Sequence, residues 1–289
     1  MNNLLSKCAF IYCSCDSYSD LWEPYFFLLN KYWSDIQMRV ILNTETKFFN
    51  THNDYSIKIE TFNCTNKCSW SQRLLNILDV INEEFVFLVV DDLFLQSKVD
   101  NIHFNNMLNL LDNSKDLASI QLQGIRIQSW EDKTNEFHSE EHIINGKKYT
   151  FRKIELTKTE TFPTLWKKDV LIKWLRPWES IWGFEGYGIA RAKRGKLKES
   201  VLRLQEPNIF NFLWVDECSP VINGKWFDSH KIDDFFKLNE ISIDFNKRGR
   251  ISYDEYLTHY VSLFEHFKKY SLLEGIRRAI NYIRSIYFN

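Results

Sequence analysis

The chain has 289 residues, and its 37 Lys and Arg against 38 Asp and Glu give a formal net charge of −1 at pH 7. This balance offers no general electrostatic footprint for nucleic acid, so we expect no nucleic-acid partner. The amino terminus lacks the apolar region of a signal peptide, and no apolar run is long enough to span a bilayer. The sequence therefore predicts a cytoplasmic protein whose six cysteines are mostly reduced.

The first hundred residues predict strands and helices in alternation. Period-2 and buried apolar runs predict strands, and capping-box patterns at Asp20 and Ser69 predict two helix starts. Leu74, Leu75, Leu78 and Ile81 would face the core from the second helix. The predicted strands cover residues 8–15, 38–42, 55–59 and 85–90. Strands separated by helices imply a mostly parallel sheet with right-handed crossovers, which is an α/β fold.

The most informative segment is the uninterrupted apolar run at residues 85–90, which ends abruptly in Asp91 and Asp92. A buried parallel strand that ends in two carboxylates places acid where open α/β sheets bind ligands. Two adjacent carboxylates are costly to bury unless a cation joins them, and a divalent metal bridging to phosphate is the usual solution. The alternative is that Asp91 and Asp92 simply start an ordinary turn.

Residues 119–123 predict another strand, and the polar stretch 124–160 predicts an irregular loop region suited to acceptor recognition. Three tryptophans and two acids then gather between Trp174 and Gly186. Aromatic rings stack on the apolar faces of sugars, and a neighbouring acid can deprotonate an attacking hydroxyl. The alternative is that the tryptophans are core and that both acids cap a helix at 187–193.

The carboxyl-terminal part predicts a tight hairpin turn at Asn223-Gly224 and a helical tail at 251–289. Two capping boxes, at Ser252 and Ser271, favour two helices in this tail. An apolar stripe on the second, flanked by Arg277 and Arg284 with Arg278 opposite, fits either an anionic membrane or a docking surface on the protein itself or a second subunit.

These residues together resemble the GT-A-fold glycosyltransferases of bacterial cell-surface polysaccharide biosynthesis, such as those that build lipopolysaccharide or capsule. The resemblance covers roughly the first four-fifths of the chain, although the usual motif is Asp-x-Asp rather than two adjacent carboxylates. Both side chains can reach one metal only if the backbone turns at Asp91. The segments that carry the resemblance are 15–18, Trp70 with Arg73, 85–92, 162–169, 178–185 and 221–226.

The resemblance implies a GT-A-like (Rossmann-like) domain at 1–250, with a nucleotide-sugar half at 1–123 and an acceptor half at 124–250. Asp91 and Asp92 would bind Mn²⁺ or Mg²⁺, with His230 as a third ligand. Glu185 would be the general base, with Glu179 as the alternate. The donor-binding candidates are Asp16, Trp70, Arg73, Asp91 and Lys225. For Asp16 a helix cap is the alternative role, and for Arg73 a surface salt bridge.

The sequence thus predicts a metal-dependent transferase that moves a sugar from a nucleotide donor, most readily a UDP-sugar, to a glycan or lipid-linked glycan of the cell envelope. Peripheral contact with the inner face of the cytoplasmic membrane and a homo-oligomer are further expectations. A nucleotidyltransferase that makes the activated sugar is one alternative, but residues 13–17 contain no phosphate-loop glycine. A non-catalytic carbohydrate-binding protein is the other. Cys64 and Cys68 are four residues apart, which is not a zinc-finger spacing.

Overall fold

The computed structural model describes residues 4–64, 67–122, 139–154, 163–194, 200–215 and 218–256, together with 258 and 280. The strands are β1 (Cys8–Cys13), β2 (Arg39–Asn43), β3 (Ile59–Phe62), β4 (Phe85–Val90), β5 (Leu117–Gln121), β6 (Ser139–Ile144), β7 (Lys147–Ile154), β8 (Thr164–Lys167), β9 (Ser200–Glu206), β10 (Val221–Ile222), β11 (Lys225–Phe227) and β12 (Arg250–Ile251). The α-helices are α1 (Trp22–Tyr32), α2 (Trp70–Val80), α3 (Asn101–Asn113), α4 (Lys168–Trp174), α5 (Ile181–Arg194) and α6 (His230–Leu238). Short 3₁₀ segments include η2 (Asp16–Leu21) and η4 (Phe245–Lys247).

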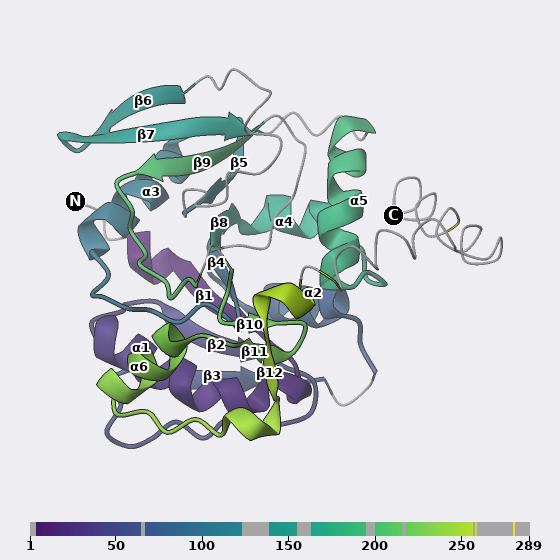
Figure 1. The fold of residues 1–289 in the computed structure, drawn as a ribbon. Coiled ribbons are helices and arrows are strands. Elements are labelled where there is room, and N and C mark those ends of the chain that lie inside the picture. Colours follow the sequence, from purple (N-terminus) through teal and green to yellow (C-terminus); the bar gives the residue numbers. More distant parts are fainter. Residues whose placement is uncertain are drawn as a thin grey trace.

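A nine-stranded sheet runs through the molecule in the order β3-β2-β1-β4-β8-β5-β9-β7-β6 (Figure 1). The half built from β3, β2, β1 and β4 is parallel throughout. Beyond it, β8 lies antiparallel between β4 and β5, and β7 and β6 add an antiparallel hairpin at the far edge. The predicted α/β class is confirmed, and the parallel character predicted from the first hundred residues holds for that half.

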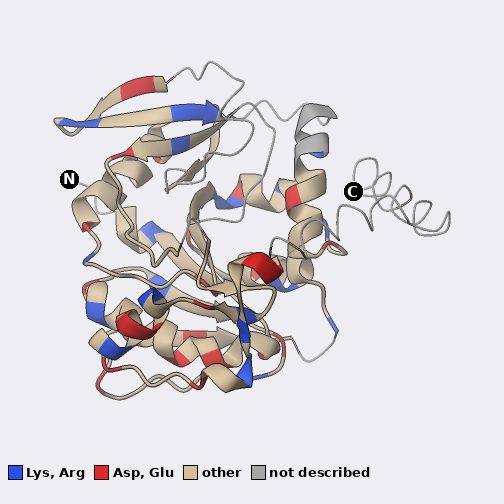
Figure 2. Ribbon diagram, viewed as in Figure 1, with Lys and Arg blue, Asp and Glu red and all other residues tan. Residues whose placement is uncertain are grey.

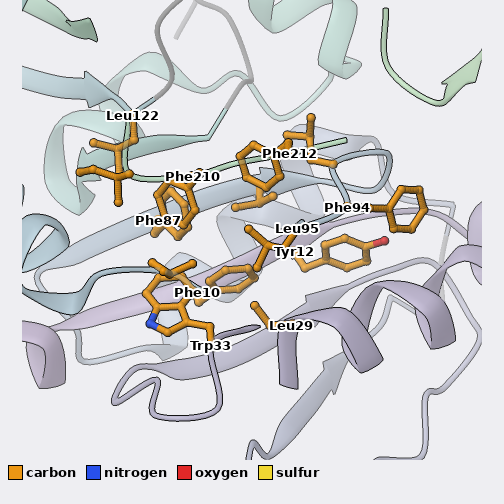
Figure 3. Packing of buried hydrophobic residues seen from close by; sticks show 14 of the residues in the cluster. Phe10, Tyr12, Leu29, Trp33, Phe87, Phe94, Leu95, Leu122, Phe210 and Phe212 are labelled. Atoms are coloured by element: carbon orange, nitrogen blue, oxygen red, sulfur yellow. The ribbon is translucent and has the colours of Figure 1, made fainter. Parts of the chain in front are cut away.

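Helices cover both faces of this sheet, because residues along the central strands alternate between two cores. Phe10 and Phe87 point to the larger core, which includes α1, α3 and α6. Ile11 and Leu88 point to the other core, under α2, α4 and α5. Figure 3 shows the larger core, where the rings of Phe87 and Phe210 stack with centroids 5.1 Å apart. This double burial explains why β1 and β4 are continuous apolar runs.

Several predicted boundaries were wrong for identifiable reasons. The third strand lies at β3 rather than at 55–59, because Tyr55 donates to Glu23 instead of pairing in the sheet. The segment predicted as irregular contains the β6–β7 hairpin, whereas residues 123–138 and 155–162 lie outside the described part. The capping box expected at Asp20 does not form, because Asp20 pairs with Arg248 and the helix begins after Leu21. Ser69 does cap α2, accepting from the amide of Gln72 at 3.0 Å.

A three-stranded sheet, β10-β11-β12, packs beside the carboxyl ends of the central strands. The predicted hairpin turn is confirmed, since Asn223 and Gly224 both have positive φ and join β10 to β11. The tail begins with the predicted capping box, in which Ser252 and Glu255 bond to each other's amides. The second tail helix and its arginines lie outside the described residues.

Among the described helices, none combines the length and apolar composition needed to cross a bilayer. Basic and acidic residues are interspersed along the described ribbon, in line with the balanced composition of the chain (Figure 2).

Candidate active site at the carboxyl ends of β1 and β4

The acid pair lies where the first and fourth strands end side by side. Cys13, the last residue of β1, pairs with Val90, the last residue of β4. The next residues on β4's side are Asp91 and Asp92, which form a turn rather than a continuation of the strand. This turn is the backbone change that allows two adjacent side chains to face the same region.

Asp91 is held by the end of β1. The hydroxyl of Ser14 donates to Oδ2 of Asp91 at 2.9 Å, and the indole Nε1 of Trp22 donates to the same hydroxyl oxygen at 2.7 Å. The hydroxyl of Tyr12 donates to the backbone oxygen of Asp91 at 3.3 Å. Trp22 and Tyr12 are both buried. Asp91 is therefore oriented by a chain of hydrogen bonds that begins in the core.

Asp92 is held from the other side by Ser219, whose hydroxyl lies 2.7 Å from Oδ2 of Asp92. Ser219 comes just before β10, so the small sheet contributes directly to the acid pair. Because each carboxylate bonds one serine through one oxygen, its other oxygen has capacity left for a cation or ligand.

Burial dominates the electrostatics of the pair. It raises the pKa of Asp91 to about 7, with the neighbouring charge of Asp92 as the second cause, while the hydrogen bond from Ser14 opposes the shift. Burial also raises the pKa of Asp92, against the hydrogen bond from Ser219. A bound cation would relieve this cost by compensating both charges.

The protein supplies only part of the ligand set that a hard divalent metal would need at this position. Two carboxylates supply oxygen ligands that suit Mn²⁺ or Mg²⁺. His230 is exposed at the first residue of α6, and no group of three His, Cys, Asp or Glu side chains gathers to hold a metal among the described residues. The described residues therefore do not bring three such ligands together at Asp91 and Asp92, and metal binding by His230 stays a prediction. The remaining ligands would have to be phosphate oxygens and water.

Arg73 is buried, with 7% of its surface exposed, and it braces the end of β1. Its Nη2 donates to the backbone oxygen of Ser14 at 3.1 Å, and its Nη1 lies 3.5 Å from Oε1 of Glu45. Glu45 also accepts from the amide of Asp16 at 3.0 Å. The Arg73 side chain is thus buried and does not form the surface salt bridge considered above. It is linked to Asp91 through Ser14. Direct contact with a donor stays a prediction.

Asp16 fixes the loop after β2. Its carboxylate accepts from the amides of Thr46 and Lys47 at 3.0 Å each and from the hydroxyls of Thr44 and Thr46. Partial burial alone would raise the pKa of Asp16, but these hydrogen bonds outweigh it and lower the pKa to about 2. Asp16 is therefore engaged in loop structure, and it does not act as the helix cap that was its alternative role.

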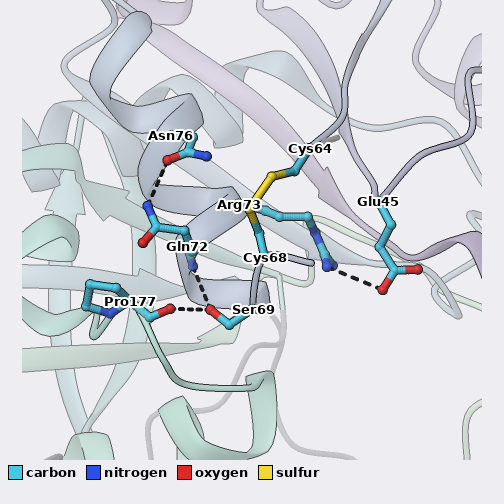
Figure 4. The surroundings of a disulfide bond; sticks show 8 residues. All are labelled: Glu45, Cys64, Cys68, Ser69, Gln72, Arg73, Asn76 and Pro177. Atoms are coloured by element: carbon cyan, nitrogen blue, oxygen red, sulfur yellow. Dashed lines mark hydrogen bonds and ion pairs between the residues drawn. A yellow bond between two sulfur atoms is a disulfide. The ribbon is translucent and has the colours of Figure 1, made fainter. Parts of the chain in front are cut away.

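Two cysteines lie at the start of α2, where Cys64 and Cys68 form a disulfide beside Arg73 and the cap residue Ser69 (Figure 4). The amide of Cys64 donates to the backbone oxygen of Glu45 at 2.8 Å, which ties this loop to the Arg73–Glu45 pair. Cys8, Cys13, Cys15 and Cys218 are free thiols.

Glu179 is a structural residue rather than a base. Its carboxylate accepts from both terminal nitrogens of Arg191, and the two side chains are only 2% and 4% exposed. Arg191 also donates to the backbone oxygen of Trp174 at 2.9 Å. A carboxylate that is fully paired with a guanidinium in the core is poorly placed to take a proton from a substrate.

The other candidate base, Glu185, lies half-buried on the second turn of α5. This helix begins at Ile181, so neither acid caps a helix at 187–193. The preceding residue, Phe184, packs on Trp70 with ring centroids 5.5 Å apart, which places Trp70 in the core rather than at a donor. Trp182 is 77% exposed, unlike the buried Trp174. Catalysis by Glu185 stays a prediction.

Lys225 is exposed at the start of β11, and its charge lowers the pKa of Glu255 together with the Ser252 capping bonds that dominate the shift.

Sequence reasoning missed Ser14, Ser219 and Arg248. Ser14 directly follows β1 and could have been found as a strand-end polar residue. Ser219 and Arg248 have no local signal, because their partners are more than a hundred residues away.

No family model and no curated protein matches the chain. Among solved structures, residues 1–349 of S. aureus TarS share 11% identity over 97% of this chain and 81% of that chain, with a TM-score of 0.48. Bifunctional IspDF from Campylobacter jejuni shares 12% identity over 71% of this chain and 51% of that chain, with a TM-score of 0.36. The galactosyltransferase LgtC, in complex with donor and acceptor sugar analogues, shares 9% over 64% and 65%, with a TM-score of 0.35. Scores below 0.5 carry no argument about function, so the proposal below rests on the site.

Proposed function

We propose that the chain is a glycosyltransferase that uses Asp91 and Asp92 to hold a divalent metal against the diphosphate of a nucleotide-sugar donor. The observation that supports it most is the half-buried acid pair at the carboxyl end of β4, next to the end of β1 and braced by two serines. Open α/β sheets bind their ligands at this edge. Burying two carboxylates together is unfavourable for the free protein, which favours a cationic ligand there.

The donor side of this mechanism depends on charge. A bound Mn²⁺ or Mg²⁺ would neutralise the charge that grows on the diphosphate leaving group as the glycosidic bond breaks. Asp91 and Asp92 would hold that ion in a fixed place because Ser14 and Ser219 orient them. Arg73 would contribute indirectly, by fixing the backbone of Ser14.

The acceptor side would be formed by α5. The buried pair of Glu179 and Arg191 fixes the start of this helix. Glu185 would then take the proton from the acceptor hydroxyl, and the exposed ring of Trp182 offers an apolar surface for a sugar face. The proposal also includes a cell-envelope glycan as acceptor, a UDP-sugar as donor and a cytoplasmic location. These three parts rest on the resemblance of the sequence to GT-A-fold glycosyltransferases.

The test is a panel of sugar nucleotides, assayed for slow hydrolysis with and without Mn²⁺. We expect one donor to be hydrolysed only with metal, and Asp91→Asn and Asp92→Asn to lose the activity by about 10²-fold or more. Asp79→Asn, on the exposed side of α2, is the matched control and should behave as wild type. Undiminished hydrolysis in both variants would refute the metal role.

The same panel separates the alternatives. Release of pyrophosphate from a nucleoside triphosphate and a sugar phosphate would identify a nucleotidyltransferase instead. Binding of free glycan with no response to any nucleotide would identify a carbohydrate-binding protein.

A further inference from the structure

Tyr18 comes four residues after Ser14, the residue that binds Asp91, and lies beside the small sheet. It is half-buried against the larger core, on η2. A Cβ atom added to Gly224 would lie 3.8 Å from the hydroxyl oxygen of Tyr18, so this hydroxyl lies beside the β10–β11 turn. Burial raises the pKa of Tyr18 to about 12, and the charges of Asp91 and Asp92 contribute to the shift. The hydroxyl thus stays protonated and can donate a hydrogen bond.

Within the part of the chain that the structure describes, the Tyr18 hydroxyl makes no hydrogen bond, although η2 directly follows the strand end that binds Asp91. A phenol hydroxyl in such a place usually finds a partner, and the diphosphate that the proposed function brings to Asp91 and Asp92 would provide acceptor oxygens.

Arg248 fixes the ring of Tyr18. Its guanidinium lies 4.3 Å from the ring centroid and is only 7% exposed. It donates to both carboxylate oxygens of Asp20, at 2.7 and 2.5 Å, to the backbone oxygen of Ser17 at 2.7 Å and to that of Gly224 at 3.2 Å. One side chain therefore joins η2, the β10–β11 turn and the segment before β12. Four of its five N–H donors bond within the protein, so Arg248 acts through other residues.

We infer that Tyr18 is a donor-binding residue, whose hydroxyl donates to the diphosphate, and that Arg248 is the positioning residue that holds its ring for this contact. The inference rests on the proposed function and adds two residues to the donor site. Lysine cannot replace Arg248, because a single ammonium lacks the planar fork that spans four acceptors in two segments and stacks on a ring.

Arg250 provides a matched control two residues along the chain. It also stacks on an aromatic ring, that of Phe245 at 4.2 Å, and also pairs with an aspartate, Asp233. Its contacts are with η4 and α6 rather than with η2 and the β10–β11 turn. Replacing Arg250 removes the same kinds of interaction without touching Tyr18.

The experiment measures the binding of UDP and UMP to the full chain by calorimetry, with Mn²⁺ present. Tyr18→Phe should weaken UDP binding about 10-fold and leave UMP nearly unchanged, because the lost bond goes to the second phosphate. Arg248→Lys should reproduce this pattern, and the double variant should be no weaker than either single one, since both remove the same contact. Arg250→Lys should leave the UDP-to-UMP affinity ratio unchanged.

Two outcomes separate the inference from its premise. If the wild type binds none of UDP, GDP, ADP and CDP with Mn²⁺, the proposed function fails and the inference fails with it. If the wild type binds a diphosphate and Tyr18→Phe binds it equally well, the inference alone is overturned. Equal losses for UDP and UMP in Arg248→Lys would reduce Arg248 to a general structural role.

Discussion

Replacing Asp91 by Asn should stabilise the metal-free protein at alkaline pH. Burial and Asp92 raise the pKa of Asp91 from 3.8 to about 7. Because the folded-state pKa is raised, the favourable contribution of the neutral carboxyl is complete below pH 3.8 and is lost as the pH rises towards 7. Three units at 1.36 kcal/mol each give a ceiling of about 4 kcal/mol. Asn has a similar shape, accepts from Ser14 and carries no charge at any pH.

The assay is urea unfolding in EDTA at pH 5 and pH 8, for the wild type and the variant. We expect an advantage for Asp91→Asn of about 1.6 kcal/mol at pH 5, which grows to about 4 kcal/mol at pH 8. Adding Mn²⁺ at pH 8 should stabilise the wild type and not the variant, because only the wild type gains the cation. Asp79→Asn controls for removing a negative charge. A variant that gains nothing between pH 5 and pH 8 would refute the claim that the acid pair is electrostatically strained.

Three further changes probe the surroundings of the site. Asp16→Asn should destabilise the protein at pH 7, since its lowered pKa provides stability that is lost only as the pH falls through about 2; unchanged urea unfolding would contradict its role in the loop. Glu179→Gln should cost about 3–5 kcal/mol by leaving Arg191 charged and buried, whereas Glu185→Gln should keep the melting temperature and slow turnover about 10²-fold; the reverse pattern would exchange their roles. Ser219→Ala should weaken Mn²⁺ affinity in calorimetry by loosening Asp92, while Ser219→Thr should restore it, and equal affinities in all three proteins would exclude positioning by this hydroxyl.

The parts of the fold that the sequence predicted correctly are those with a strong local signal. The apolar runs of β1 and β4, the Ser69 cap and the Asn223-Gly224 turn each depend on residues close in sequence. The position of the acid pair followed from the same kind of signal, since a strand that is buried on both faces must end in polar residues where it reaches the ligand edge.

The residue roles that failed depend on distant partners. Glu179 was chosen as an acid near tryptophans, but its partner Arg191 is twelve residues further on and its burial appears only once α5 packs on α2 and α4. Asp20 was expected to cap a helix, but its carboxylate pairs with Arg248, which lies 228 residues further along the chain. In both cases a long-range ion pair outweighed a local preference, and single-sequence patterns do not contain such pairs.

The bracing of the acid pair also determines when the site can form during synthesis. Ser219 lies 127 residues after Asp92, and Arg248 lies 228 residues after Asp20. The proposed donor half, residues 1–123, therefore leaves the ribosome with both carboxylates but without two of the side chains that organise them. Contacts this far apart in sequence form slowly because they close long loops. A nascent or truncated chain that ends before residue 219 would carry the acids without a finished site, so the proposed metal site would be complete only near the end of translation.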